Sequence, residues 1–193
     1  QTIDLRGADK QGYTFEEARR LSQPATGMCG LYWSAYRSML RLAGLASAGV
    51  KLGSQTGFDS GSMLDYVYRN QPAGIGPLAC IGRLIDRQYL NAVGWRGIRQ
   101  RKQHIEELLE KGMKQLRTEG RKVHLLDIAA GHGRYVLEAL EASKCRPDAV
   151  VLRDFSDINV REGSALINAK GLAKIARFEK GDAFDRQAVA QTS

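Results

Sequence analysis

The stretch Leu125-Leu126-Asp127-Ile128-Ala129-Ala130-Gly131-His132-Gly133-Arg134-Tyr135 decides the fold of this chain. Its apolar first part predicts a short buried strand, its small residues predict a turn, and a helical pattern begins directly after the turn. Gly131 and Gly133 carry no side chain, so a ligand can approach the backbone closely there. Because the first amide groups of the next helix are free and its dipole is positive at that end, the turn predicts a site for a phosphate or a carboxylate.

The chain continues from this stretch as alternating strands and helices. Strands are expected at residues 123–128, 149–152 and 175–178, and helices at residues 135–143 and 159–171. Asn159, with Glu162 three residues later, predicts the N-cap of the second helix. Strand-helix-strand alternation is typical of a parallel sheet in an α/β fold. We therefore expect a partial, Rossmann-like parallel sheet that is truncated after its third strand and preceded by a helical N-terminal region.

The residues before Gly120 predict helices separated by glycine-rich breaks. A short helix is expected to begin at a capping box formed by Thr14 and Glu17 and to end at Pro24. Further helices are expected at residues 28–50, 62–69, 78–93 and 97–118. Four glycines among Ser, Thr and Asp predict a loop or linker over residues 49–61. The expected organisation is a helical segment with its linker at 1–60, a helical region at 61–119, and the first half of a cofactor-binding domain at 120–193.

Composition excludes several classes of protein. The chain has 193 residues, 43% hydrophobic and 26% charged, which suits a packed domain and excludes wholesale disorder. Its three cysteines, Cys29, Cys80 and Cys145, form no CxxC pair, so a disulfide framework or a zinc site is disfavoured and a cytoplasmic location is expected. The net charge of +8 favours an acidic partner only slightly.

Two segments before Gly120 leave alternatives open. Met28 to Val50 is apolar at helical spacing, but Arg37 and Arg41 disfavour a membrane-spanning helix. It predicts either a helix packed on a protein core or a helix in peripheral contact with a membrane surface. The basic run from Trp95 to Lys102 predicts a solvated helix face, with a phosphate-contacting patch as the alternative. Because it has one aromatic beside its cations, it disfavours a nucleic-acid site.

Carboxylates follow each predicted strand and suggest a nucleoside ligand. Asp154 lies 21 positions after Gly133, where doubly wound folds place the acid that holds ribose hydroxyls. Asp182 follows the third strand and could reach a base. A dinucleotide remains an alternative, but Val136 stands where its third glycine is expected. Asp127 disfavours a pyrophosphate and favours an amino group or a sulfonium, both of which S-adenosylmethionine carries.

These motifs resemble those of a known family. Asp127 to Gly133, Asp154-Phe155-Ser156 and Gly181-Asp182-Ala183 are similar to the first three signature motifs of class I S-adenosylmethionine-dependent methyltransferases. With residues 63–70, 82–87 and 94–102, they resemble a group of bacterial methyltransferases sometimes fused to an α/β-hydrolase-like domain.

The resemblance implies a role for each matching residue. Gly131 and Gly133 would approach the methionine portion of the cofactor, and Asp127 would meet its amino group, directly or through water. Asp154 would hold the ribose, and Asp182 would approach the adenine, with Ala183 or Phe184 packed on the ring. Phe155 and Ala129 are also expected in the cofactor site. Ala129 stands where many members have glycine, and an alanine is tolerable there if its φ is negative. His132 is either a general base or, as we favour, a loop residue contacting the cofactor or its own helix end.

The sequence therefore predicts the cofactor-binding portion of an S-adenosylmethionine-dependent methyltransferase that needs no metal. Its catalytic base is not identified, and its acceptor is a small molecule or a lipid. A dinucleotide-dependent oxidoreductase and a non-enzymatic membrane- or anion-binding module are the alternatives.

Overall fold

The computed structural model describes residues 27–190 of the chain. The described residues belong to two units, which divide between Leu42 and Ala43. The described part of the first unit lies in helix α2 (Gly27–Gly44), whose apolar sequence is interrupted by Arg37 and Arg41. The predicted capping box at Thr14 lies outside the described residues. Among those described, no helix is both long enough and apolar enough to cross a membrane.

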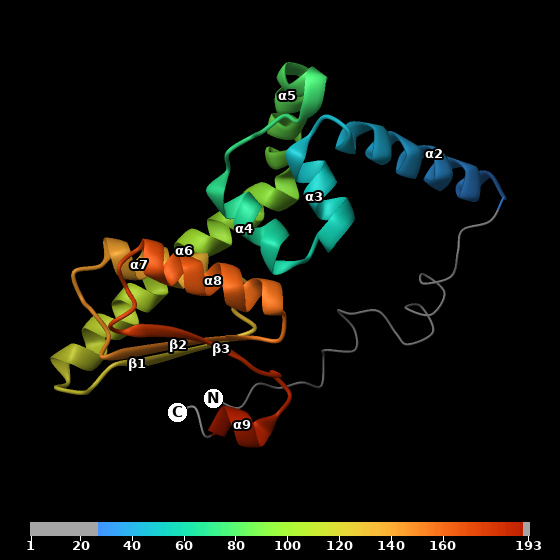
Figure 1. The fold of residues 1–193 in the computed structure, drawn as a ribbon. Coiled ribbons are helices and arrows are strands. Elements are labelled where there is room, and N and C mark those ends of the chain that lie inside the picture. Colours follow the sequence, from blue (N-terminus) through green and yellow to red (C-terminus); the bar gives the residue numbers. More distant parts are fainter. Residues whose placement is uncertain (1–26, 191–193) are drawn as a thin grey trace, which may run out of the picture. The chain divides into compact units, whose positions relative to one another are not determined.

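The second unit has a helical layer and a sheet layer (Figure 1). The helical layer contains α3 (Ala48–Thr56), α4 (Gly61–Arg69), the short 3-10 helix η2 (Gly76–Leu78), α5 (Ala79–Leu90) and α6 (Val93–Thr118). Two sequence predictions are wrong here: residues 28–50 form two helices rather than one, and residues 49–56 of the predicted loop are helical. The predicted helices at 62–69, 78–93 and 97–118 are confirmed, although α6 begins four residues earlier than expected.

Contacts with the rest of the protein explain why α3 is helical despite its glycines. A Cβ at Gly49 would lie 2.7 Å from Asp86 Oδ1, and one at Gly53 would lie 2.4 Å from the Phe58 ring. Ser47 caps the helix by accepting a hydrogen bond from Val50 N at 3.2 Å. The glycines are therefore required for close packing, and packing outweighs their low helix propensity.

The sheet layer confirms the predicted strand-helix alternation. Its elements are β1 (His124–Ile128), α7 (Arg134–Ala142), β2 (Ala149–Asp154), α8 (Asp157–Ala169), β3 (Ala176–Lys180) and α9 (Arg186–Ala190). The three described strands are parallel in the order β1-β2-β3. Because each connection is a strand-helix-strand crossover, α7 and α8 lie on the same face of the sheet, alongside α6 (Figure 1).

Alternating strand residues supply the core beneath these helices. Leu125, Val150, Leu152 and Phe178 point to the helical face and pack with Leu137 and Leu140 of α7. The carboxyl ends of β1 and β2 meet at one edge of the sheet, since Ile128 pairs with Arg153. The turn after β1 and the acid that ends β2 are therefore neighbours.

Candidate cofactor site

The turn between β1 and α7 is built from three residues with left-handed backbone conformations. Their φ angles are +60° at Ala129, +59° at Gly131 and +68° at Gly133. Ala130 N donates to Arg153 O at 3.0 Å, and Gly133 N donates to Ala130 O at 2.8 Å, so the turn is tied to β2 and to itself. The condition for an alanine at position 129, a negative φ, is not met: its Cβ is held in a conformation that ordinarily favours glycine.

Close approaches explain the two glycines. A Cβ at Gly133 would lie 2.5 Å from Leu152 Cδ1, and one at Gly131 would lie 3.2 Å from Gly61 Cα at the start of α4. The helical layer therefore reaches the turn directly, across 70 positions of sequence. This approach leaves Gly131 facing a narrow space between the two layers.

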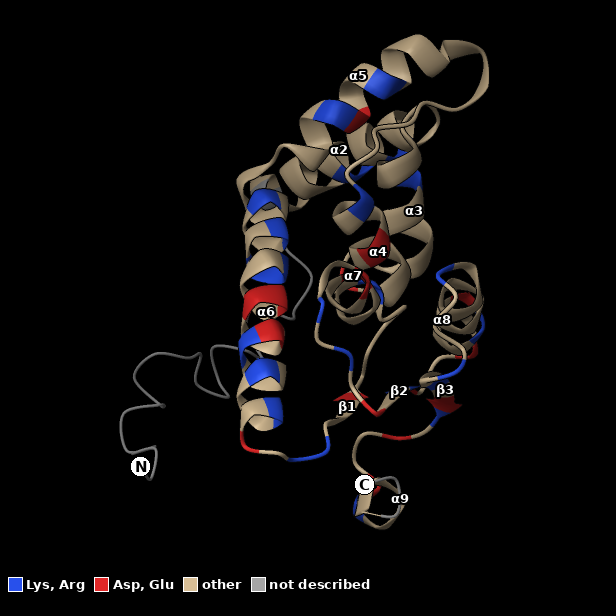
Figure 2. Ribbon diagram, turned by 90° about the vertical axis from the view of Figure 1, so that its left-hand side faces the viewer, with Lys and Arg blue, Asp and Glu red and all other residues tan. Residues whose placement is uncertain are grey.

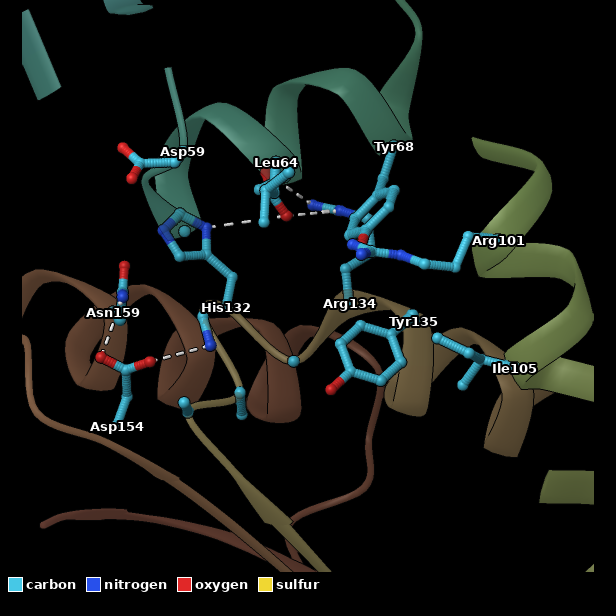
Figure 3. A pocket seen from close by; sticks show the side chains of 16 residues that line it. Asp59, Leu64, Tyr68, Arg101, Ile105, His132, Arg134, Tyr135, Asp154 and Asn159 are labelled. Atoms are coloured by element: carbon cyan, nitrogen blue, oxygen red, sulfur yellow. Dashed lines mark hydrogen bonds and ion pairs between the residues drawn. The ribbon is translucent and has the colours of Figure 1, made fainter. Parts of the chain in front are cut away.

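The carboxylate of Asp154 closes the turn from the neighbouring strand. Its Oδ2 accepts from Gly131 N at 2.9 Å, and its Oδ1 accepts from Asn159 Nδ2 at 3.0 Å (Figure 3). The same Oδ1 also accepts from Ser156 N at 2.9 Å. Asn159 is therefore not the N-cap of α8, as the sequence predicted; Ser156 holds that place and Asn159 orients Asp154. A carboxylate has about four acceptor positions, so Asp154 keeps one for a ligand.

Asp127, at the end of β1, is turned toward the protein. Its Oδ2 accepts a hydrogen bond of 2.5 Å from the hydroxyl of Tyr135 in the first turn of α7. Burial raises the pKa of Asp127, the Tyr135 hydrogen bond opposes that rise, and the charge of Asp154 adds to it. Asp127 does not line the cavity beside the turn, but Tyr135 does. The carboxylate therefore acts at that cavity through Tyr135.

The first cavity lies between the two layers and has a volume of about 490 Å³. The turn and its neighbours form one wall, and α4 and α6 form the other (Figure 3). The lining residues from the helical layer are Asp59, Gly61, Leu64, Asp65, Tyr68, Arg101 and Ile105. The sequence predicted no role for these residues, although Leu64, Asp65, Tyr68 and Arg101 lie in the segments 63–70 and 94–102 that carry the family resemblance.

A second cavity of about 420 Å³ lies on the other side of Asp154. It is lined by Ala129, Asp154, Phe155, Gly181, Asp182, Ala183 and Phe184. Phe155 and Phe184 expose 71% and 91% of their surface, so two aromatic faces are available there. Asp182 Oδ1 accepts from Phe184 N at 2.8 Å, which shapes the loop after β3. Ala129 and Asp154 line both cavities, so the two hollows adjoin at the carboxylate.

An ionic network joins the turn to the helical layer. Arg134 Nε lies 2.6 Å from Asp65 Oδ1, and Arg134 Nη1 lies 3.0 Å from Glu138 Oε1. His132 contributes Nε2 at 3.2 Å from Ser62 Oγ and Nδ1 at 3.6 Å from Asp65 Oδ1. Burial alone would raise the pKa of Asp65, but hydrogen bonds and charge from His132 and Arg134 hold it below its usual value. His132 is thus engaged with α4 at the rim of the first cavity.

The structure therefore brings the predicted residues together in two groups. Gly131, His132, Gly133 and Asp154 line the first cavity, and Asp154, Phe155, Asp182 and Ala183 line the second, with Ala129 in both. No group of three or more His, Cys, Asp or Glu side chains that could hold a metal ion occurs within residues 27–190. Adjoining hollows at the carboxyl edge of a parallel sheet, with an acid between them, are the arrangement in which doubly wound folds bind nucleotide-type cofactors.

Comparison with known proteins places the chain in a family. The family model described as "Putative methyltransferase" matches residues 1–193, and the chain belongs to this family. The chain is also 49% identical over 187 residues to the "Uncharacterized protein YnbC" of Escherichia coli (strain K12). That match covers 96% of this chain but only 31% of the relative.

Solved structures show weaker likenesses. WbdD, co-crystallised with a kinase inhibitor, gives a TM-score of 0.36 at 21% identity, covering 46% of this chain and 19% of that one. An RNA methyltransferase from Salinibacter ruber in complex with S-adenosyl-L-homocysteine gives 0.30 at 22% identity, covering 40% of this chain and 48% of that one. With TM-scores this low, neither likeness bears on what this chain binds.

Proposed function

We propose that this chain binds S-adenosylmethionine and forms the cofactor-binding portion of a methyltransferase. The observation that carries the proposal is the position of Asp154, whose carboxylate adjoins both cavities and keeps one acceptor position. If the ribose hydroxyls of the ligand bound this carboxylate, the adenine would lie in the cavity on one side of Asp154 and the charged methionine portion in the cavity on the other side. Membership of the methyltransferase family supports this choice of cofactor.

The second cavity suits the adenine. Phe155 and Phe184 offer apolar faces on which a purine can stack, and Asp182 offers a carboxylate at the base edge. The backbone of the loop is ordered by the Asp182 hydrogen bond to Phe184 N. These residues would hold the base by stacking and by one or two polar contacts, which is how such sites fix orientation.

The first cavity suits the methionine portion. The free amides at the start of α7 and the left-handed turn can receive a carboxylate. A cationic group near the turn would also favour the ionised form of Asp127, whose pKa burial raises. When bound, the cofactor would supply an activated methyl group on a sulfonium, and the protein would hold and align it.

The partner and the location remain predictions. The acceptor is a small molecule or a lipid, nucleic acid is disfavoured, and a hydrolase domain is fused or associated. Cytoplasmic location and membrane contact through Met28–Val50 also remain part of the proposal. Within that range, α2 and α3 are separate helices, and Gly49 and Val50 are buried.

Isothermal titration with S-adenosylmethionine, S-adenosylhomocysteine and NAD tests the proposal. We expect the first two to bind and NAD not to bind. Asp154→Ala should weaken binding roughly tenfold or more, because it removes a charged hydrogen-bond acceptor. Asp157→Ala is the matched control: Asp157 is an exposed acid at the start of α8 that lines neither cavity, and its loss should leave affinity unchanged.

Binding of NAD alone would overturn the proposal in favour of an oxidoreductase. Binding of none of the three ligands by the full-length protein would favour a non-enzymatic module. Thermal unfolding of Asp154→Ala must be measured beside the titration, because this carboxylate also holds the turn. A variant that binds as tightly as the parent would remove Asp154 from the site.

A further inference from the structure

Helix α5 and the start of α6 carry a basic surface away from the candidate cofactor site. Residues 79–96 contain three exposed basic side chains, Arg83, Arg87 and Arg96, and a single acidic one, Asp86. Asp86 is fully buried, so the exposed charge of this stretch is entirely positive. Figure 2 shows Lys and Arg on α5 and along the first half of α6. Such a surface is complementary to an anionic partner.

The rotation of α5 about its axis is determined by its packed face. A Cβ at Gly82 would lie 1.9 Å from Ala46 O, so the helix meets α3 and its preceding loop through bare backbone. Asp86 and Leu90 follow on the same face and are buried. Residues on the opposite side of α5 are consequently turned outward, whatever their chemistry.

The outward side of α5 is apolar where a solvated helix would be polar. Leu78, the last residue of η2, is followed at intervals of three residues by Ile81 and Leu84 of α5, and the three expose 59%, 55% and 62% of their surface. Arg83 and Arg87 flank them and are also exposed. Neither arginine forms an ion pair with any residue of the described range 27–190. A stripe of large aliphatic side chains beside unpaired arginines is unusual for a surface that faces only water.

A hollow of about 280 Å³ lies on this side of the helix. It is lined by Pro72, Arg83, Leu84 and Arg87. Two guanidinium groups thus stand around a small apolar floor. Arginine binds phosphate through parallel N–H donors, so the hollow has the charge and the size to receive a phosphodiester group.

We propose that α5 docks on a membrane surface that contains anionic phospholipid. Leu78, Ile81 and Leu84 would enter the boundary between headgroups and acyl chains, and Arg83 and Arg87 would contact lipid phosphates. Interfacial helices combine these two features, an apolar face and basic residues beside it. A nucleic-acid surface would match the arginines but would leave the aliphatic stripe in water. The proposal does not depend on which cofactor the protein binds.

Vesicle co-sedimentation of the purified full-length protein tests the proposal. We expect binding to vesicles of phosphatidylcholine mixed with phosphatidylglycerol and little binding to vesicles of phosphatidylcholine alone. Arg83→Gln with Arg87→Gln should reduce partitioning about thirty-fold, from the usual contribution of a basic residue near an anionic surface. Ile81→Ser with Leu84→Ser should reduce it about tenfold or more, because two apolar side chains no longer enter the boundary.

Matched controls separate the site from general charge and apolarity. Arg121→Gln with Lys122→Gln makes the same change of charge at exposed positions after α6, and Leu108→Ser removes an exposed leucine of α6. Both controls should bind vesicles like the parent. All variants change exposed side chains, and circular dichroism and thermal unfolding should show that they remain folded.

Several outcomes would overturn the proposal. These are equal binding to both vesicle types, equal loss in the controls, or binding to duplex DNA without binding to vesicles. If light scattering showed that Ile81→Ser with Leu84→Ser converts a dimer to a monomer without changing vesicle binding, the stripe would be a contact between copies of the chain instead.

Discussion

The two carboxylates that organise this protein differ in how many of their acceptor positions the protein uses. Asp86 is fully buried and accepts from Ser47 Oγ at 2.6 Å, Gly49 N at 2.7 Å, Tyr66 OH at 2.5 Å and Ala73 N at 2.9 Å. Asp154 accepts three hydrogen bonds and borders two cavities.

This difference separates a structural centre from a binding centre. Every acceptor position of Asp86 is occupied, so that carboxylate can only hold α3, α4 and α5 together. The Asp154 carboxylate holds its turn and still faces open space. Burial and hydrogen bonding are common to both residues, and only the unused acceptor together with the adjoining cavity points to a ligand.

Replacing Asp86 should give the largest effect on stability. Asp86→Ala leaves four buried donors without a partner, and we expect the free energy of unfolding to fall by about 4 kcal/mol. Urea unfolding followed by circular dichroism measures the change. Asp86→Asn keeps one acceptor oxygen, so its free energy of unfolding should lie between those of Asp86→Ala and the parent. A loss no larger than that of Asp157→Ala would contradict a structural role for Asp86.

Breaking the ionic link between the turn and α4 at Asp65 should give the next largest loss of stability, and that loss should depend on pH. Because the folded protein lowers the pKa of Asp65, its stabilisation is present above the unfolded pKa near 4 and is lost as pH falls through the folded value. Asp65→Asn should cost about 2 kcal/mol at neutral pH and progressively less in acid. Unfolding measured over an acid pH series, with Asp157→Asn as control, would show whether the difference in free energy of unfolding between the parent and Asp65→Asn decreases as the pH falls.

Substituting Gly131 should separate stability from binding. Gly131→Ala and Gly120→Ala both place a Cβ at a left-handed position, at φ of +59° and +70°, and each should cost about 1 kcal/mol. Only the Gly131 Cβ enters the space beside α4, because no atom lies within 4 Å of one at Gly120. We therefore expect a larger Kd for S-adenosylmethionine in Gly131→Ala alone. Equal affinities in the two variants would place the ligand elsewhere.

The smallest effect is expected at Ala129. Ala129→Gly relieves a left-handed alanine but adds freedom to the unfolded chain, so stability should rise by roughly 0.5 kcal/mol. Ala130→Gly, next to it, removes a buried methyl group from a conformation that is not left-handed and should destabilise the protein. Thermal unfolding of both variants measures the two effects. A loss of stability in Ala129→Gly would contradict the inference that the backbone of Ala129 is strained.

Local sequence signals predict the strand-turn-helix of residues 124–142 and the alternation of helices and strands that follows it. Those signals are apolar runs, glycines in a turn and an acid at the end of a strand. They also place Gly131, Gly133, Asp154 and the loop at Asp182 around one edge of a sheet, because parallel strands end together.

The residues that face this edge of the sheet are set by tertiary packing. Gly61 and Asp65 reach the turn from α4, Asn159 orients Asp154 instead of capping its helix, and Gly49 lies in a helix rather than a loop. Each of these outcomes depends on a partner about five to 70 positions away, and on the space left between packed backbones. Local propensity carries no record of such contacts, so the folded chain alone sets the second wall of the cavity and the outward face of α5.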